Sequence, residues 1–427
     1  MEGPPRNVRP VPVTALSYGP HAIARREGKV MFVRGAVPGD EVILAVREER
    51  RSYAYADVVE VVKASPDRRQ PPCPYLPQCG GCPWQHISYP AQLRAKERNL
   101  RDQLSRAIDL AGVEWRPIVP APAEFGYRHR LSLRVDGRRV GFFAGGTHRL
   151  VPVTSCLLAE PALAGAIPAA GEWIAGLDSD FRRLEALVAA DGERWVLLAE
   201  AQGALVARDR VASESLLAAY PRLAGLVLRG KRTRWVLGDD RCGLEIEPGL
   251  PWVVHAGTFT QVTRAGNRAL LQSVLDAGQF RREQRVLDLF AGAGNLSLPI
   301  ARRVARVVAV ERGELAVADG IANARDLGLS HCEFRCASTQ HAVEAARRQG
   351  EHFDVVVLDP PRSGAAEVMA ALCALAPERV IYVSCDPATL ARDLRALAYR
   401  YRIERVQPID LFPQTYHVET VITAKLA

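Results

Sequence analysis

The amino-acid sequence predicts an α/β protein of several domains, whose C-terminal part is a doubly wound, Rossmann-like parallel sheet. With 427 residues, the chain is longer than one hydrophobic core usually serves. After Gly257, apolar runs at residues 285–289, 306–310, 353–358 and 380–384 are separated by segments of helical periodicity. Strands and helices that alternate in this way form a parallel sheet covered by helices on both faces. Length and alternation together therefore predict a C-terminal α/β domain with further domains before it.

Residues 1–62 predict a small, OB-like β-barrel. Apolar and polar residues alternate in short runs at 11–16, 29–34, 41–46 and 53–62, and glycines and prolines separate these runs. Short strands joined by tight turns are typical of a small barrel, and we expect five of them.

Residues 63–255 predict a central α+β domain, which leaves 256–427 for the C-terminal α/β domain. A loop rich in proline, glycine and cysteine comes first, and residues 92–110 then show the apolar spacing of an amphipathic helix with a basic face. Strand-like stretches such as 130–135 and 195–199 follow, with helical segments between them.

The distribution of charge permits a polyanionic partner. The segment 63–134 contains twelve Lys and Arg against six Asp and Glu, in a chain whose net charge is +8. We interpret this segment as facing RNA, although a solvated arginine-rich surface explains the same excess. The sequence has no apolar run that could span a bilayer and no export signal near its start. We therefore expect a cytoplasmic protein with no membrane partner and no obligate protein partner.

Residues 286–297 predict a site for a nucleoside cofactor. A buried strand runs through Phe290 into a turn that contains Gly292 and Gly294, and a helix follows, so the backbone can approach a ligand beside a helix N-terminus. Glu311 ends the next strand, where a carboxylate can accept hydrogen bonds from ribose hydroxyls. The third glycine of a dinucleotide-binding turn is missing, which favours S-adenosylmethionine over NAD.

Cys385 has the position of a catalytic nucleophile. It follows the predicted strand 380–384 and precedes Asp386 and a helix. C5 of uracil is too weak a nucleophile to take a methyl group directly, so an enzyme must first add a nucleophile to C6. A helix N-terminus favours a thiolate, and we expect this effect at Cys385. A buried structural cysteine is the alternative, and Asp359 at the end of the preceding predicted strand favours the catalytic interpretation.

Glu419 is the candidate for the base that removes the C5 proton after methyl transfer. It shares one face of a predicted strand with His417, because residues two apart point the same way. A solvent-exposed pair on an edge strand is the alternative. Arg362 stands after Asp359-Pro-Pro, where enzymes that methylate amino groups place an aromatic residue, so attack on an amine is disfavoured.

Three cysteines, Cys73, Cys79 and Cys82, lie close together in the proline- and glycine-rich loop. In a chain expected in the reducing cytoplasm, such spacing indicates metal binding more than disulfide formation.

The combined motifs resemble the bacterial RNA 5-methyluridine methyltransferase family, in particular its iron–sulfur members that act on ribosomal RNA. The likeness extends over almost the whole chain: residues 1–62 resemble the family's RNA-binding TRAM barrel, and the loop around Cys79 and Cys82 resembles its cluster loop. The motifs that carry the resemblance are Asp288-Leu-Phe-Ala-Gly-Ala-Gly-Asn295, Asp359-Pro-Pro-Arg362, Ser384-Cys-Asp-Pro387 and His417-Val-Glu419.

The resemblance implies roles for individual residues. Cys385 is the implied nucleophile and Glu419 the implied base. S-adenosylmethionine is contacted by Gln261, Phe290, Asn295, Glu311 and Asp359. Cys156 joins Cys73, Cys79 and Cys82, and four thiolates suit a [4Fe–4S] cluster or a zinc ion. Spacing and resemblance favour the cluster, with a structural role. The family often contacts the adenine with Asn or Asp where this chain has Ser338, so that contact stays open.

The expected substrate is therefore a uridine of 23S ribosomal RNA. A transfer RNA uridine is the first alternative. A catalytically weak iron–sulfur RNA-binding protein is the second, which intact Cys385 and Glu419 disfavour. Methylation of cytosine or of another RNA carbon is the third; cytosine enzymes carry a second cysteine near Asp359-Pro-Pro, and this chain has none at 354–370.

Overall fold

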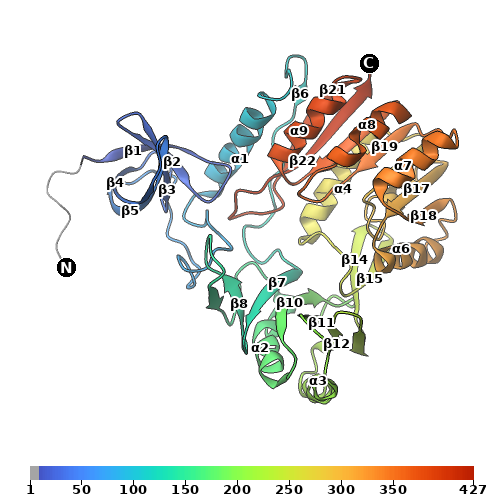
Figure 1. The fold of residues 1–427 in the computed structure, drawn as a ribbon, viewed down its shortest axis with the longest axis horizontal. Coiled ribbons are helices and arrows are strands. Elements are labelled where there is room, and N and C mark those ends of the chain that lie inside the picture. The colour runs from blue at the N-terminus through green and yellow to red at the C-terminus, as the bar shows by residue number, and fades with distance from the viewer. Residues whose placement is uncertain (1–8) are drawn as a thin grey trace.

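A computed structural model describes residues 9–427, and the first eight residues of the predicted barrel domain lie outside the described residues. The chain forms a closed five-stranded barrel, a seven-stranded central sheet, a two-stranded sheet and an eight-stranded C-terminal sheet. Figure 1 shows the barrel, the central sheet and the C-terminal sheet as three separate masses of the molecule. The predicted barrel and C-terminal α/β fold are confirmed. Within residues 9–427 no helix has both the length and the apolar character needed to cross a bilayer.

The barrel strands bury apolar side chains at alternate positions over part of their length, and these side chains fill the barrel interior. Met31, Val33, Ala54 and Ala56 are buried inside it, and Trp84 from the following loop packs in the same core. The strands, in spatial order 1-2-3-5-4, are β1 (Val11–Leu16), β2 (Ala22–Arg26), β3 (Lys29–Arg34), β4 (Glu41–Glu49) and β5 (Tyr53–Lys63).

The central sheet is mixed, and two helices pack on it. Its strands, in the order 13-12-11-10-7-8-9, are β7 (Arg130–Asp136), β8 (Arg139–Phe143), β9 (Leu150–Pro152), β10 (Phe181–Val188), β11 (Trp195–Ala201), β12 (Leu223–Arg229) and β13 (Arg234–Gly238). The helices are α2 (Ala166–Gly176) and α3 (Ala207–Ala219), and a short 3-10 turn covers Pro161–Leu163. Buried Trp173 and Trp195 belong to their shared core.

The C-terminal sheet has helices on both faces, as a doubly wound sheet requires. Its strands, in the order 18-17-16-19-20-22-21-6, are β16 (Arg285–Leu289), β17 (Arg306–Glu311), β18 (Cys332–Cys336), β19 (Val355–Leu358), β20 (Arg379–Ser384), β21 (Tyr401–Ile409), β22 (Glu419–Leu426) and β6 (Glu114–Trp115). One face packs on α4 (Arg264–Gly278), α5 (Ser297–Ala301) and α6 (Glu314–Asp326). The other packs on α1 (Tyr89–Leu104), α7 (Thr339–Arg348), α8 (Ala366–Leu375) and α9 (Pro387–Leu397).

Two segments from the predicted central region pack into this C-terminal core. Helix α1 buries Leu100 and Leu104 there, and β6 extends the sheet beside β21. The hairpin of β14 (Arg241–Glu247) and β15 (Leu250–His255) buries Trp252 on the opposite face. The helix predicted at 92–110 corresponds to α1, which begins at Tyr89 and ends at Leu104. The domain limits at residues 62 and 255 stay a prediction.

Candidate active site

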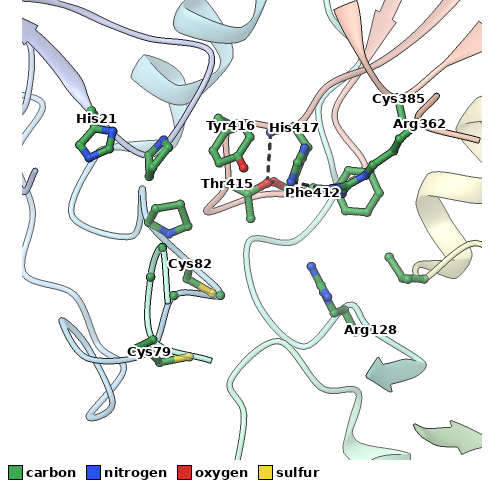
Figure 2. A pocket seen from close by; sticks show the side chains of 18 of the residues that line it. His21, Cys79, Cys82, Arg128, Arg362, Cys385, Phe412, Thr415, Tyr416 and His417 are labelled. Carbon is green, nitrogen blue, oxygen red and sulfur yellow. Dashed lines mark hydrogen bonds between the residues drawn. The ribbon is translucent and has the colours of Figure 1, made fainter. Parts of the chain in front are cut away.

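A cleft of about 2820 Å³ runs between the barrel, the cysteine loop and the carboxyl edge of the C-terminal sheet. Figure 2 shows Cys385 and Arg362 on one side of this cleft and Cys79 and Cys82 on another. The sequence-predicted residues that line it are Cys73, Cys79, Cys82, Gln261, Phe290, Glu311, Asp359, Cys385 and Glu419. The fold thus brings most of the predicted site together from distant parts of the chain.

Sheet topology places Asp359, Cys385 and Glu419 side by side. Asp359 and Cys385 follow the neighbouring parallel strands β19 and β20. Strand β22 runs antiparallel to β20, with Thr420 opposite Ser384, so Glu419 at the start of β22 lies at the same edge as Cys385. Parallel α/β sheets bind ligands at this carboxyl edge.

The surroundings of Cys385 favour its thiol over its thiolate, contrary to the preference expected from the helix N-terminus. Burial and the carboxyl groups of Glu419 and Asp359 raise its pKa to about 12, and Arg362 offsets only part of this rise. The N-terminus of α9 is already occupied, since the Asp386 carboxylate accepts hydrogen bonds from the backbone NH groups of Ala388 and Thr389 at 2.9 and 3.0 Å.

The two carboxyl groups beside the thiol also hold protons more tightly than usual. Burial raises the pKa of Asp359 to about 7. Burial, followed by the nearby Asp359, raises the pKa of Glu419 well above its ordinary value. The amide of Gln261 donates to Asp359 Oδ2 at 3.4 Å and so ties the cofactor side of the cleft to this group.

The glycine turn after β16 has the sharp backbone course that the predicted nucleoside site requires. Phe290 has a φ of 61° and Gly292 a φ of 55°, which turns the chain sharply at the strand end. Glu311 accepts hydrogen bonds from the backbone NH groups of Gly292, Arg312 and Gly313 at 3.2, 2.8 and 2.8 Å. These contacts fix the Glu311 carboxylate at the rim of the cleft.

Asn295, a residue of the predicted cofactor set, and Ser338, whose contact was left open, form hydrogen bonds with other parts of the chain. The side-chain amide of Asn295 exchanges two 2.8 Å hydrogen bonds with Asn267 of α4, and Asn295 is not part of the cleft lining. Ser338 does line the cleft, but its hydroxyl caps α7 by accepting from the His341 NH at 3.3 Å. Asn295 therefore connects the glycine turn to α4 and does not face the cleft in this structure.

Three further residues near the thiol escaped sequence analysis as site residues. Tyr18 of the barrel donates its hydroxyl to the Cys385 carbonyl at 3.2 Å, across 367 positions of sequence. Arg362 lies 3.4 Å from His417 Nε2, and burial followed by the charge of Arg362 lowers the pKa of His417 to about 4. The Asp359-Pro-Pro-Arg362 motif was a signal for Arg362, whereas nothing in the sequence marks Tyr18.

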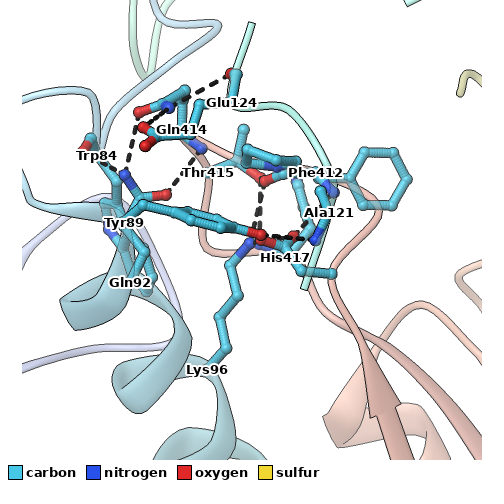
Figure 3. A network of polar contacts seen from close by, with 12 residues as sticks. Trp84, Tyr89, Gln92, Lys96, Ala121, Glu124, Phe412, Gln414, Thr415 and His417 are labelled. Carbon is cyan, nitrogen blue, oxygen red and sulfur yellow. Dashed lines mark hydrogen bonds and ion pairs between the residues drawn. The ribbon is translucent and has the colours of Figure 1, made fainter. Parts of the chain in front are cut away.

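A buried polar network holds the segment 410–417, which leads into β22 (Figure 3). Lys96 of α1 donates to Asp410 at 2.6 Å and to the Phe412 carbonyl at 3.0 Å. Gln92 of the same helix accepts from the Gln414 NH at 2.8 Å. Phe412, Thr415, Tyr416 and His417 of this segment line the cleft. Helix α1 therefore fixes the wall that ends at Glu419.

The cysteine loop packs against the segment that contains Cys156. Tyr75 of the loop accepts from the Thr154 NH at 2.9 Å, and Cys79 forms a β-bridge with Ala144. Burial raises the pKa of Cys79, Cys82 and Cys156, and Cys73 lies near enough to all three to add to this rise. Within residues 9–427, no three His, Cys, Asp or Glu side chains are arranged to hold a single metal ion.

The basic segment 63–134 is only partly directed at the cleft. Seven of its twelve cationic side chains form ion pairs, among them Arg68 with Asp40 and Arg69 with Glu124. Arginines from five other regions complete the cationic lining, which consists of Arg34, Arg47, Arg68, Arg69, Arg128, Arg149, Arg312 and Arg362. The positive wall is thus assembled by the fold.

The doubly wound sheet, the glycine turn with Glu311 and the thiol at the carboxyl edge define an S-adenosylmethionine-dependent methyltransferase. Residues 250–425 match the family model described as tRNA (Uracil-5-)-methyltransferase. The fold resembles that of a Pyrococcus abyssi tRNA (uracil-54, C5)-methyltransferase solved with S-adenosyl-L-homocysteine, with a TM-score of 0.75, 22% identity, and coverage of 97% of this chain and 99% of that one.

Curated relatives match nearly the full chain. An uncharacterized RNA methyltransferase of Gloeobacter violaceus is 35% identical, over 97% of this chain and 95% of its own. The 23S rRNA (uracil(1939)-C(5))-methyltransferase RlmD of Alkalilimnicola ehrlichii is 35% identical, over 98% of this chain and 96% of its own. The chain belongs to the RNA uracil-C5 methyltransferase family, and it is an S-adenosylmethionine-dependent RNA (uracil-C5) methyltransferase.

Proposed function

We propose that this enzyme methylates C5 of a uridine in 23S ribosomal RNA, with Cys385 as nucleophile and Glu419 as base. The observation that carries the catalytic assignment is the meeting of Asp359, Cys385 and Glu419 at adjacent strand ends in one cleft. Full-length relatives named for uracil 1939 of 23S rRNA support the choice of RNA.

Cys385 adds to C6 of the target uracil. The Cys385 thiol gives its proton to water in the open cleft, its sulfur bonds to C6, and the π electron pair of the C5–C6 double bond moves to C5 and, by resonance, to the carbonyl oxygen at C4. S-adenosylmethionine, when bound, supplies the methyl group that C5 then takes. Burial raises the pKa of Cys385, and Arg362 opposes this rise, so Arg362 is a cationic group beside the thiol that favours thiolate formation.

Glu419 removes the proton that C5 carries after methylation. The electron pair of that C–H bond re-forms the C5–C6 double bond, and the sulfur of Cys385 leaves C6. A base is most effective when its pKa lies near the working pH, and the buried position of Glu419 raises its pKa in that direction.

Gln261, Phe290, Glu311 and Asp359 are proposed to contact S-adenosylmethionine, with Asn295 supporting the turn. Glu311 has carboxylate lone pairs to offer ribose hydroxyls at the cleft rim. A Glu311→Gln variant should bind S-adenosylmethionine more weakly in calorimetry and bind RNA like the wild type. Equal affinity of both proteins for S-adenosylmethionine would remove Glu311 from the proposed set.

Two variants distinguish the role of the nucleophile from that of the base, because each stops the reaction at a different step. Cys385→Ala should form no protein–RNA adduct and transfer no methyl group. Glu419→Gln should allow attack and methyl transfer but accumulate the adduct, because loss of the C5 proton must precede release of sulfur. Each variant is incubated with RNA that spans uracil 1939 and with labelled S-adenosylmethionine, then run on a denaturing gel.

Cys336→Ser is the matched control, because Cys336 is an exposed thiol at the end of β18. It should methylate like the wild type. Methylation by Cys385→Ala, or an adduct that maps to another cysteine, would overturn the assignment. If the enzyme methylates transfer RNA and not the ribosomal segment, the substrate is a transfer RNA uridine. The roles proposed for Cys385 and Glu419 would not change.

We further propose that Cys73, Cys79, Cys82 and Cys156 hold a [4Fe–4S] cluster with a structural role. These four thiolates would hold the cluster, which would link the cysteine loop to the segment that contains Cys156. Arg128 fits an anionic group there: its Nε atom is buried without a partner, and its guanidinium lies in the field of Cys82 and Cys156.

Metal analysis tests the cluster proposal. Anaerobically purified protein should be brown and contain iron and sulfide, whereas Cys79→Ser should be colourless and less soluble. Cys336→Ser should keep the colour. A colourless wild type with stoichiometric zinc would replace the cluster by a zinc site.

A further inference from the structure

The turn between β1 and β2 reaches from the barrel to the peptide group of the nucleophile. Tyr18 in this turn donates its hydroxyl to the main-chain carbonyl of Cys385 at 3.2 Å. Pro20 and His21 of the same turn line the cleft, whereas Tyr18 is not among the lining residues in the part of the chain that the structure describes. Tyr18 is therefore placed to act through Cys385 and not on a substrate in the cleft.

The backbone at Cys385 belongs to no regular element, because the residue lies at the bend between β20 and α9. The residues on either side are held from within the C-terminal domain. The Ser384 hydroxyl accepts from the Asp386 NH at 3.2 Å, and the Asp386 carboxylate caps α9. The carbonyl of Cys385 itself accepts from Tyr18. The barrel thus supplies a restraint on the Cys385 backbone that neither the strand nor the helix provides.

The turn that contains Tyr18 is held in place, as a restraint on another residue must be. The NH and the hydroxyl of Ser17 donate to the His21 carbonyl at 3.0 and 2.7 Å, which closes the turn. Buried Trp84, from the loop that follows the barrel, donates its indole NH to the Gly19 carbonyl at 3.1 Å. The turn is therefore fixed both by its own hydrogen bonds and by a residue outside the barrel strands.

The side chain of Tyr18 is also constrained. Its ring packs edge-on against Tyr416, with the ring centroids 5.6 Å apart, an arrangement that aromatic pairs favour. Figure 2 shows Tyr416 on the barrel side of Cys385. Burial, followed by the negative charge of Asp386, raises the pKa of Tyr18, so its hydroxyl keeps its proton at neutral pH and remains a donor.

We propose that Tyr18 is a positioning residue for the covalent step: its hydroxyl orients the peptide group of Cys385 and so directs the sulfur toward C6 of the uracil. One rotatable bond separates a cysteine sulfur from the main chain, so the position of the sulfur follows the backbone. A displacement of about 1 Å between reacting atoms can lower a rate by about 100-fold. The inference rests on the proposed role of Cys385 as nucleophile and gives the barrel a part in catalysis.

The test compares the rate of adduct formation in Tyr18→Phe and the wild type, since this variant loses the hydroxyl and keeps the ring. RNA that spans uracil 1939 contains 5-fluorouridine at the target position. A base cannot remove fluorine from C5, so the adduct persists. With this RNA and S-adenosylmethionine saturating, Tyr18→Phe should form the adduct about 3- to 10-fold more slowly, as expected for the loss of one hydrogen bond. Its dissociation constants for RNA and S-adenosylmethionine should equal those of the wild type.

Tyr401→Phe is the matched control, because it also removes a hydroxyl that donates to a main-chain carbonyl. Tyr401 donates to the Pro377 carbonyl at 3.0 Å and pairs with Leu426 at the end of β22, at the opposite edge of the sheet from Cys385. It should form the adduct as fast as the wild type. Slowing in both phenylalanine variants alike would show a general effect of hydroxyl loss and would overturn the inference.

A second measurement separates the position of the thiol from its acidity. The pH dependence of Cys385 alkylation by iodoacetamide should be the same in Tyr18→Phe and in the wild type, because the charged groups around the thiol are unchanged. A profile that shifts to another pH in Tyr18→Phe would show that the hydroxyl acts on thiol acidity, and the positioning role would be wrong.

Equal rates of adduct formation in Tyr18→Phe and the wild type would overturn this inference alone, provided that the adduct maps to Cys385. An adduct on another cysteine would refute the proposed nucleophile and this inference with it. A wild type that forms no adduct with the ribosomal segment would refute the choice of RNA, and the same comparison then uses transfer RNA that contains 5-fluorouridine.

Discussion

Replacing Lys96 by methionine should destabilise this enzyme more than the loss of any surface ion pair. Lys96 and its partner Asp410 are both 0% exposed, and their charged atoms lie 2.6 Å apart. Methionine retains the length of the aliphatic chain, so the substitution removes the charge and the two hydrogen bonds that Lys96 donates.

The size of the stability loss follows from the hydrogen bonds that Asp410 keeps when Lys96 is replaced. Without Lys96, Asp410 keeps the Phe412 NH on Oδ1 at 2.9 Å, while its Oδ2 is already buried without a partner. An uncompensated buried charge of this kind costs about 3 to 5 kcal/mol of unfolding free energy. Lys96→Met with Asp410→Asn removes both charges and keeps the acceptor for Phe412, so we expect it to recover about half of that loss or more.

Urea unfolding of the wild type, both single variants and the double variant measures this coupling. Arg94→Met is the matched control, because Arg94 lies on the same helix and pairs with Asp67 at the surface, where a pair contributes at most about 1 kcal/mol. The Michaelis constant for RNA should rise in Lys96→Met, because the segment 410–417 lines the cleft. A loss under about 1 kcal/mol, or single effects that simply add, would refute the role given to this pair.

Three further predictions concern ionisation and salt. Alkylation of Cys385 by iodoacetamide, followed by peptide mass spectrometry, should accelerate about tenfold per pH unit from about pH 6 to about pH 9, because its pKa is raised to about 12; a plateau near neutrality would contradict this pKa. Asp359→Asn should raise the melting temperature at about pH 8 but hardly at about pH 4, with an intermediate effect at about pH 5. The folded protein raises the pKa of Asp359 from 3.8 to about 7, so the stability this group provides below that range is lost as pH rises through about 7; equal shifts at all three pH values would argue against it. The affinity for RNA should fall steeply with salt while that for S-adenosylmethionine barely changes, because eight arginines line the cleft; equally shallow slopes would make these arginines a solvated surface.

Local patterns predicted the strands well. The predicted limits 11–16, 29–34 and 285–289 are those of β1, β3 and β16, because alternation and short apolar runs bounded by turns identify strands directly. The residues gathered at the cleft were also foreseen in large part, because the ends of successive parallel strands meet at one edge. Both successes depend on information that lies within a few residues of each position.

Contacts between segments far apart in the sequence could not be predicted from local sequence patterns. The partners Lys96 and Asp410 are 314 positions apart, and Tyr18 meets Cys385 across 367. The protonation of Cys385 was misjudged for the same reason, since the burial and carboxyl groups that raise its pKa come from β19 and β22. Asn295, which the resemblance assigns to the cofactor, also forms hydrogen bonds with Asn267 of α4, a partner that sequence periodicity does not identify.

The position of Glu419 depends on one feature of the sheet, the antiparallel insertion of β22 between β20 and β21. A residue that begins a parallel strand lies at the amino edge, away from the ligand. Strand β22 has eight residues, and eight residues of extended chain span about 26 Å, so parallel insertion would carry Glu419 far from Cys385. Because β22 runs the other way, its first residue meets the last residues of β20. The chain reverses its direction in the segment 410–417, and Lys96 and Gln92 of α1 form hydrogen bonds with this segment. Glu419 therefore lies beside Cys385 because β22 is antiparallel to β20. Helix α1, which lies outside the predicted catalytic domain, stabilises the segment that makes this arrangement possible.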